Sequence, residues 1–370
     1  MECKYFGECG SCRLFEGGYE AQLRYKVEEN EKRFKPFYNK ELEVFASKEE
    51  HYRARAEFRI WHSGESVSYA MTSLDKQPVC IDECPQVNEH IAKLMQPLIA
   101  ALVRYEMDEK LFGCDFLSST TGDMVVSLLY HKRLDEEWHK KAQRLADELG
   151  ISIIGRSRKQ KVVIGRDYVV ERLQVGRREF AYRHIENSFT QPNPYVNRKM
   201  IEWTLAGLEK NESDLLELYC GAGNFTIPFA TKFRKVLATE ISKSSIAAAK
   251  ENMQLNDIHN IEFVRMSVEE FTQALDGVRE FNRMKHIEIE SYDFSTVFVD
   301  PPRSGMDEQS CRFVSRFENI IYISCNPQTL QRDLEMLSKT HEVEKMALFD
   351  QFPYTYHAEM GAKLRRRREV

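Results

Sequence analysis

From Asn197 onward, short apolar runs alternate with segments of helical pattern, and this alternation constrains the fold more than any other feature of the 370-residue chain. The apolar runs cover residues 214–219, 235–239, 261–265, 296–299 and 320–324. Strands that alternate with helices are typical of a parallel sheet with helices on both faces. We therefore predict an α/β fold for this half, with a doubly wound sheet of the Rossmann-like type.

The first half of the chain mixes strands and helices and carries no obvious catalytic motif. After a charged helical stretch at 19–34, the segment from Tyr52 to Ile60 alternates apolar and polar residues with a period of two, which predicts a strand. Its polar face carries arginines, which can pair with phosphates and stack on bases. We predict an N-terminal α+β RNA-binding domain at 1–180 and a second domain at 181–370. A half-exposed strand with a solvated face explains the same pattern.

The overall charge of -5 does not by itself indicate a nucleic-acid-binding protein. Binding to phosphates depends on local patches, however, and basic residues outnumber acidic residues by nine to three between Arg156 and Arg183. A solvated surface is the alternative explanation of this run. The chain has no apolar run near the roughly 20 residues of a membrane span, and it begins without the apolar core of a signal peptide. We expect a cytoplasmic protein with no membrane association and no obligate protein partner.

The first strand of the second half runs into a glycine-containing turn at 218–225. Glu240 lies 19 residues after Gly221, at the end of the next strand, where an acid can accept hydrogen bonds from ribose hydroxyls. This arrangement fits NAD as well as S-adenosylmethionine. The dinucleotide motif GxGxxG is incomplete, since Thr226 stands at its last position. S-Adenosylmethionine, which has a ribose but no phosphate, therefore fits better. A surface acid is the alternative for Glu240.

The apolar run at 320–324 ends in the sequence SCNP, which places Cys325 at the carboxyl edge of the predicted sheet. Asp300 follows another strand in the same way and opens the sequence DPPRSG. Open α/β folds bind their ligands at this edge. A thiol there can act as a nucleophile. The alternative is that Cys325 is a small buried hydrophobe, as most free cysteines are.

Taken together, these motifs resemble the uracil-C5 RNA methyltransferase family over essentially the whole chain. The resemblance rests on LYCGAGNF at 218–225, VDPPRSG at 299–305, SCNP at 324–327 and FDQFPYTYHAE at 349–359. It implies a class I methyltransferase domain that uses S-adenosylmethionine. It also implies a nucleophile, Cys325, and a base, Glu359. The residues that would contact the methyl donor by this resemblance are Gln191, Tyr219, Asn224, Glu240 and Asp300.

Within the family, the sequence segments HYRARAEFRIWH, SLLYHK and ENSFTQPN are most similar to the branch that methylates tRNA. The resemblance implies that the partner is the T arm of tRNA and that the target is the T-loop uridine at tRNA position 54. It also implies other T-loop-like RNAs as possible partners. The alternatives are rRNA methylation at C5 and a non-catalytic RNA-binding or RNA-folding module on the same scaffold. Amino-methyltransferases place an aromatic residue after Asp-Pro-Pro, where this chain has Arg303, and they need no thiol.

The chemistry of uracil explains why a thiol and a carboxylate would both be needed. Uracil C5 is too weak a nucleophile to accept a methyl group unaided. Thiolate addition to C6 creates an enolate whose C5 can take the methyl group, and a carboxylate can then remove the C5 proton. Cys325 and Glu359 would provide these two groups, although a solvated acid is the alternative for Glu359. The target base lies inside a folded loop, so it must be extruded into the pocket.

The cysteines near the N-terminus form a second motif. Nine cysteines without a secretory signal argue against a disulfide framework. Cys3, Cys9 and Cys12 form C-x5-C-x2-C, and Cys84 would provide a fourth thiolate, with Cys80 as a competing candidate. Such a set holds an iron–sulfur cluster or zinc. The motif resembles the [4Fe-4S] site of the rRNA branch, although that branch carries an N-terminal barrel for which Cys3 leaves no room. We expect a structural [4Fe-4S] cluster; zinc and a vestigial set without a ligand are the alternatives.

Overall fold

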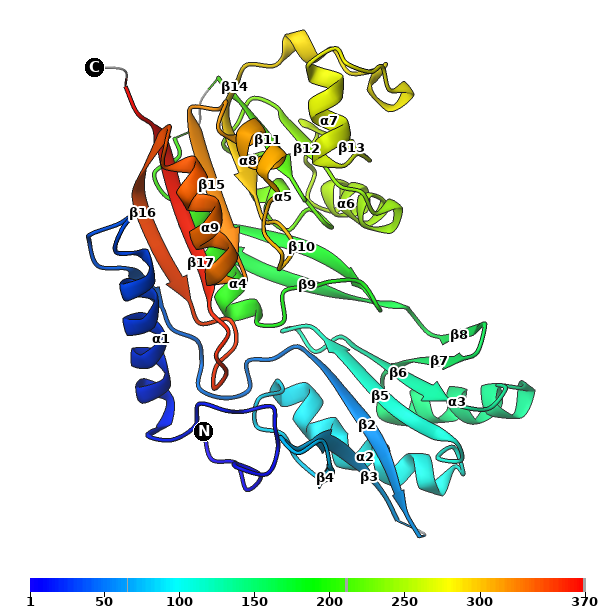
Figure 1. Cartoon of the computed structure of the whole chain (residues 1–370). Helices are drawn as coiled ribbons and strands as arrows, with labels where there is room; N and C mark the ends of the chain where they lie inside the picture. The colour runs from blue at the N-terminus through cyan, green and yellow to red at the C-terminus, as the bar shows by residue number, and fades with distance from the viewer. Residues whose placement is uncertain (65, 210–211, 369–370) are drawn as a thin grey trace.

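The computed structural model describes residues 1–64, 66–209 and 212–368, and it shows two β-sheets and an additional β-hairpin (Figure 1). The described helices are α1 (Gly18–Phe34), α2 (Glu89–Arg104), α3 (Glu136–Leu149), α4 (Pro194–Leu205), α5 (Thr226–Phe229), α6 (Lys243–Leu255), α7 (Val268–Leu275), α8 (Glu308–Val314) and α9 (Pro327–Leu337). None of the helices in these residues has the length and the apolar character that crossing a membrane requires.

The strands fall into the two halves of the chain. Those of the first half are β1 (Glu43–Phe45), β2 (Arg55–Ser63), β3 (Ser66–Thr72), β4 (Pro78–Ile81), β5 (Leu111–Ser118), β6 (Met124–Tyr130), β7 (Ser152–Ser157), β8 (Gln160–Ile164), β9 (Tyr168–Val175) and β10 (Arg178–Ile185). Those of the second half are β11 (Asp214–Leu218), β12 (Val236–Thr239), β13 (Ile261–Val264), β14 (Phe294–Val299), β15 (Asn319–Ser324), β16 (His341–Phe349) and β17 (Glu359–Arg366).

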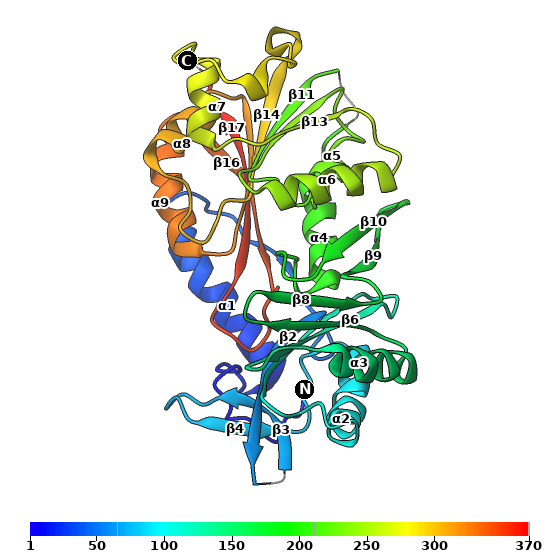
Figure 2. The ribbon, with the colours of Figure 1, turned by 90° about the vertical axis from the view of Figure 1, so that its right-hand side faces the viewer.

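The larger sheet has eight strands in the order β1-β16-β17-β15-β14-β11-β12-β13. Strands β11 to β15 run parallel to one another, whereas β17 lies antiparallel between β15 and β16. Helices α1, α7, α8 and α9 cover one face, and α4, α5 and α6 cover the other (Figure 2). The predicted doubly wound α/β sheet is therefore confirmed. Strands β16 and β17 extend it in a way that the strand–helix alternation did not predict.

Strand β15 lies at the centre of the larger sheet because its side chains serve two cores. Ile320 and Tyr322 pack into the core beneath α8 and α9, while Ile321 and Ile323 pack into the core beneath α4 and α5. A strand that is buried on both faces appears in sequence as a continuous apolar run. The chain emerges from this strand at Cys325, the first residue beyond its carboxyl end.

The smaller sheet has seven strands in the order β4-β3-β2-β5-β6-β7-β8, and α2 and α3 pack against it. On β2, Ala56, Phe58 and Ile60 are buried, while Glu57 and Arg59 are exposed. The predicted period of two for this strand is therefore confirmed, and so is the mixed α+β character of the first half.

The segment that precedes the smaller sheet belongs to the larger one. Strand β1 pairs in parallel with β16, and helix α1 packs beside the same sheet (Figure 1). Strand β10, at 178–185, pairs with β9 across the boundary predicted near residue 180. The division into units at 1–180 and 181–370 stays a prediction. In the sheets, α1 and β1 from the first of these ranges belong with the larger sheet.

Helix α1 is fixed to the larger sheet by a buried ion pair. Lys26 Nζ lies 2.6 Å from Asp350 Oδ1, and both side chains are almost fully buried. Gln22 donates to the other oxygen of this carboxylate at 2.9 Å, and Lys26 also donates to the carbonyl oxygen of Phe352 at 2.9 Å. Asp350 directly follows β16, so α1 holds the start of the loop that leads to β17.

Replacing Lys26 by methionine is expected to lower the free energy of unfolding by about 3–5 kcal/mol, because the Asp350 carboxylate would stay buried without its partner. The double variant Lys26→Met/Asp350→Leu is expected to recover most of this loss, since no unpaired charge remains. Urea titration followed by circular dichroism measures both effects. Lys32→Met, at an exposed position of the same helix, is the matched control. A Lys26→Met variant as stable as the control would show that the pair does not stabilise the fold.

Candidate active site

A cavity of about 800 Å³ opens at the carboxyl edge of the parallel strands of the larger sheet. Its lining includes all seven of the predicted catalytic and donor-contact residues: Gln191, Tyr219, Asn224, Glu240, Asp300, Cys325 and Glu359. Four of these residues directly follow β11, β12, β14 and β15, because the carboxyl ends of parallel strands meet at one edge of a sheet. One cavity therefore brings together the side chains that the sequence singled out.

The turn after β11 lets a ligand approach the backbone closely. The φ angles are 63° at Tyr219, 54° at Gly221 and 85° at Gly223. A positive φ is uncommon for a residue that has a Cβ atom, and such strained residues cluster at ligand sites. The Gly221 N–H of this turn donates to Glu240 Oε2 at 3.1 Å, and the Ser242 N–H, which follows β12, donates to Glu240 Oε1 at 2.8 Å. The Glu240 carboxylate is thereby held in place, and its remaining lone pairs can accept from hydroxyl groups.

The amide side chains of Asn224 and Gln191 are oriented by other amides. Asn224 exchanges two hydrogen bonds with Asn197 of α4, at 2.8 and 2.9 Å. Gln351 donates to Gln191 Oε1 at 2.6 Å, and both of these side chains are buried. Because Gln351 follows Asp350, this contact also ties Gln191 to the β16–β17 loop.

Cys325, Asp300 and Glu359 form an acidic region of the cavity. Burial, followed by the charges of Glu359 and Asp300, raises the pKa of the Cys325 thiol to about 11, whereas Arg303 lowers it. Burial raises the pKa of Asp300 to about 7. Burial and the charge of Asp300 raise the pKa of Glu359 well above its ordinary value. The two carboxyl groups therefore oppose each other's ionisation, and a cationic ligand would favour their charged forms and the thiolate.

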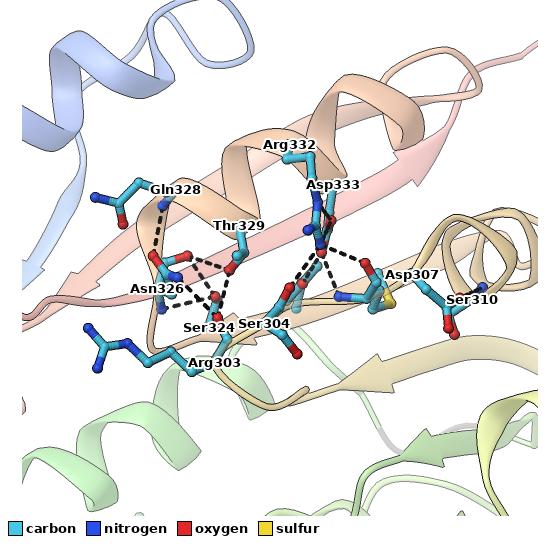
Figure 3. A network of polar contacts seen from close by, with 12 residues as sticks. Arg303, Ser304, Asp307, Ser310, Ser324, Asn326, Gln328, Thr329, Arg332 and Asp333 are labelled. Atoms are coloured by element: carbon cyan, nitrogen blue, oxygen red, sulfur yellow. Dashed lines mark hydrogen bonds and ion pairs between the residues drawn. The ribbon is translucent and has the colours of Figure 1, made fainter.

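The loop that carries Asp300 is joined to the loop that carries Cys325. Asn326, next to the thiol, donates through Nδ2 to the carbonyl oxygen of Arg303 at 3.0 Å (Figure 3). The same side chain accepts from the backbone N–H of Gln328 at 3.1 Å and so caps α9. Asn326 thus fixes the first turn of α9 and the DPPRSG loop relative to the nucleophile.

The far end of the DPPRSG loop is fixed by two charged residues of α9. Arg332 Nη2 donates to the carbonyl oxygens of Ser304 and Met306 at 3.0 and 2.6 Å, and Asp333 accepts from the Met306 N–H at 2.9 Å (Figure 3). Gly305, with φ of 73°, lies so close that an added Cβ would meet Asp333 Oδ2 at 2.8 Å. The loop therefore keeps one conformation before any ligand binds.

Glu217 also lines the cavity, and the sequence analysis missed it. This residue of β11 is 1% exposed, and its Oε2 atom has no hydrogen-bond partner among the described residues. Burial raises the pKa of Glu217 well above its ordinary value, although the neighbouring Thr226 hydroxyl lowers it. An acid in the otherwise apolar run LLEL was the available signal, because such a residue is rarely buried without a partner. A cationic ligand group would supply the missing partner.

The predicted metal site is not supported. Within residues 1–64, 66–209 and 212–368, no group of three or more His, Cys, Asp or Glu side chains lies where it could hold a metal ion. Cys3, Cys9, Cys12 and Cys84 are near enough for their charges to interact, but Cys12 Sγ accepts a hydrogen bond from Gln86 at 2.6 Å. Burial raises the pKa of Cys12 to about 12. Cys3, Cys9, Cys12 and Cys84 are therefore neighbouring thiols, and the [4Fe-4S] cluster stays an expectation without support among the described residues.

The N-terminal segment that carries Cys3, Cys9 and Cys12 forms backbone contacts with both halves of the molecule. The Gly10 N–H donates to the carbonyl oxygen of Thr72 in the smaller sheet at 3.0 Å. The N–H groups of Arg13 and Leu14 donate to the carbonyl oxygen of Tyr354 at 2.8 and 3.0 Å. Tyr354 lies in the β16–β17 loop, so the N-terminal segment connects the smaller sheet to the loop that ends at Glu359.

The chain is similar to known proteins over nearly its whole length. The family described as tRNA (Uracil-5-)-methyltransferase matches residues 18–367. A tRNA/tmRNA (uracil-C(5))-methyltransferase of Sulfurimonas denitrificans is 64% identical over 366 residues, which cover 98% of this chain and 99% of the relative. A relative with the same description from Aliarcobacter butzleri is 52% identical over 372 residues, with 99% of each chain covered.

A solved structure shows the same fold. It is that of the Pyrococcus abyssi tRNA (uracil-54, C5)-methyltransferase in complex with S-adenosyl-L-homocysteine, with a TM-score of 0.70 and 23% identity. The similarity covers 95% of this chain and 86% of that one. The fold is thus that of a class I methyltransferase with an N-terminal α+β part. From the family match over nearly its whole length and the high identity to the curated relatives, the chain belongs to the tRNA (uracil-5-)-methyltransferase family.

Proposed function

We propose that this protein transfers a methyl group from S-adenosylmethionine to C5 of a uridine in tRNA, and that the target is the T-loop uridine at position 54. The observation that carries the proposal is the meeting of the Cys325 thiol, the Glu359 carboxyl group and the donor-contact residues in one cavity. The descriptions of the curated relatives support tRNA and tmRNA as substrates. The proposal includes a cytoplasmic location, which suits a tRNA substrate.

One side of the cavity is lined by Gln191, Glu217, Tyr219, Asn224 and Glu240, and we name it the donor half. S-Adenosylmethionine fits its polar groups. Glu240, fixed by two backbone N–H groups, suits the ribose hydroxyls. The buried Glu217 Oε2, which lacks a partner among the described residues, suits the cationic amino group of the donor. Tyr219, Asn224 and Gln191 line the same cavity. A donor bound there supplies an electrophilic methyl group, and its positive charge stabilises the ionised forms of the nearby acids.

Cys325 and Glu359 would carry the chemistry on the uracil ring. The Cys325 thiolate forms a bond to C6, and the electron pair of the C5–C6 double bond moves into the enolate that ends at O4. The methyl group then bonds to C5, and its bond to the donor sulfur breaks. Glu359 removes the C5 proton, the C6–sulfur bond breaks, and the double bond and the free thiolate return. No step of this sequence is assigned to the N-terminal cysteines.

A basic pocket on the smaller sheet supports binding of the T arm. This pocket has a volume of about 690 Å³, and the residues that line it include Lys132, Arg133, Arg156, Arg158 and Lys159. Phe112, which is 40% exposed, stacks on His131 at 3.9 Å between ring centroids in the same pocket. Cations beside exposed rings suit RNA, because they can pair with phosphates and stack on unpaired bases.

The experiment that tests this function is methyl transfer from labelled S-adenosylmethionine to an unmodified tRNA transcript. We expect one methyl group per tRNA and none in a transcript whose T-loop uridine 54 is replaced by cytidine. A T-arm hairpin alone should also be methylated. Label that appears only in rRNA fragments would assign the protein to rRNA instead. Tight tRNA binding without any label would identify a non-catalytic RNA-binding protein.

A further inference from the structure

The loop between β16 and β17 carries several aromatic rings, and one of them, Phe352, lines the cavity. The ring centroid of Phe352 lies 5.9 Å from that of His357. Tyr356 is 58% exposed, and its ring lies 6.1 Å from that of Tyr25 on α1, in an edge-on arrangement. Figure 1 shows this loop, in red, projecting from the larger sheet toward the smaller one. We name Tyr25, Phe352, Tyr356 and His357 the ring platform.

The ring platform is held in one arrangement by hydrogen bonds to its backbone. The carbonyl oxygen of Phe352 accepts from Lys26 Nζ at 2.9 Å and from Thr355 Oγ1 at 2.8 Å. The Thr355 hydroxyl oxygen also accepts from the His357 N–H at 3.2 Å. A second element, the N-terminal segment, binds the carbonyl oxygen of Tyr354 through two N–H groups. A surface that is ordered in advance loses little conformational entropy when a ligand binds.

Positive charge lies beside these rings. The Arg13 N–H donates to the carbonyl oxygen of Tyr354 in this loop at 2.8 Å, and Arg303 lines the cavity together with Phe352. Burial, followed by the charges of Arg303, Lys26 and Arg13, lowers the pKa of His357. Arg303 is exposed, and its guanidinium extends away from the network that holds its backbone (Figure 3). Arg13 is exposed too, and its Nε donates to the carbonyl oxygen of Gly10 at 3.4 Å. Neutral rings beside guanidinium groups suit a nucleotide, which has an aromatic base and a charged phosphate.

We propose that the ring platform, with Arg13 and Arg303, binds the nucleotide that flanks the target uridine in the RNA strand. The base of this nucleotide stacks on the exposed ring of Tyr356, and its phosphate pairs with the guanidinium groups. When the target uridine is extruded, the neighbouring base loses its stacking on that uridine. The ring platform replaces this lost stacking next to the cavity. This assignment rests on the proposed function and adds a second RNA contact, separate from the basic pocket on the smaller sheet.

The test uses T-arm hairpins that carry the fluorescent base 2-aminopurine on either side of the target uridine. With the wild type, we expect stacking to quench the fluorescence at one of the two positions. Tyr356→Ala is expected to abolish this quenching and to weaken RNA binding about tenfold, because one base loses its stacking partner. Tyr356→Phe keeps the ring and should bind as the wild type does. The melting temperature and the affinity for S-adenosylmethionine should be unchanged in both variants, since Tyr356 is exposed and outside the donor half.

The arginines are tested by the salt dependence of binding. Arg13→Ala is expected to reduce the slope of log affinity against log salt concentration by about one, because one phosphate contact is lost. Arg144→Ala, an exposed residue of α3, is the control and should leave the slope unchanged. Full quenching and full affinity in Tyr356→Ala would overturn the inference, and so would a loss in Tyr356→Phe equal to that in Tyr356→Ala. Methyl transfer by the wild type to the same hairpins is measured in parallel, so that failure of the proposed function is recognised separately.

Discussion

Cys325→Ala is expected to lose methyl transfer to tRNA completely, by a factor of about 10⁴ or more. Without the thiolate, C5 of uracil is not activated, and the remaining cavity can bind the donor and the RNA but cannot start the reaction. The Cys325 side chain is only partly buried, so an alanine leaves the fold intact. Labelled methyl incorporation measures the loss, and the affinities for S-adenosylmethionine and for tRNA should stay close to those of the wild type.

The matched control for this prediction is Cys80→Ala. Cys80 is an exposed free cysteine on β4 of the smaller sheet, away from the cavity lining. This variant is expected to methylate tRNA at the rate of the wild type. Appreciable activity in Cys325→Ala would refute the covalent mechanism, because the methyl group would then reach the RNA without the thiol.

Glu359→Gln is expected to stop the reaction one step later. Its amide cannot accept the C5 proton, so turnover should fall by about 10²–10⁴-fold, the usual contribution of a general base. The bond between Cys325 and C6 would persist, because its elimination requires loss of that proton. A covalent RNA–protein adduct that carries the methyl group should therefore accumulate and be visible on a denaturing gel with labelled donor. The adduct should be absent from the double variant Cys325→Ala/Glu359→Gln.

Glu335→Gln provides the control for the carboxylate. Glu335 is an exposed acid of α9, and we expect its replacement to change neither the turnover nor the adduct. The opposite outcome for Glu359→Gln, normal turnover without an adduct, would remove Glu359 from the mechanism. Asp300 would then be the remaining carboxyl group beside the thiol, since its charge also acts on Cys325.

The sequence predicted those site residues that follow parallel strands. Glu240, Asp300 and Cys325 each stand directly after an apolar run, Tyr219 ends another, and the parallel sheet necessarily gathers such positions at one edge. Gln191 and Glu359 belong to other elements. Gln191 lies in the loop before α4, and Glu359 is the first residue of the antiparallel strand β17. No local pattern places them in the cavity, so only the family resemblance indicated them.

Other features depend on contacts between distant segments that sequence spacing does not determine. The C-x5-C-x2-C motif predicted a metal site, but the relation of Cys84 to the N-terminal loop is set by contacts such as that between Gln86 and Cys12. Strand β1 is three residues long and therefore too short to show a period of two. Its pairing with β16 assigns the first helix and strand to the larger sheet. The buried pair of Lys26 and Asp350, which fixes α1 there, joins residues from opposite ends of the chain.

The measurement that tests the central claim most directly is the release of tritium from a tRNA transcript made with 5-tritiated uridine. Substitution at C5 must expel the hydrogen that this carbon carries. We predict that one tritium atom is released for each methyl group transferred from S-adenosylmethionine, and that neither event occurs with Cys325→Ala. Methyl transfer without tritium release would place the methyl group on another atom, such as a ring nitrogen or the ribose, and would contradict the account.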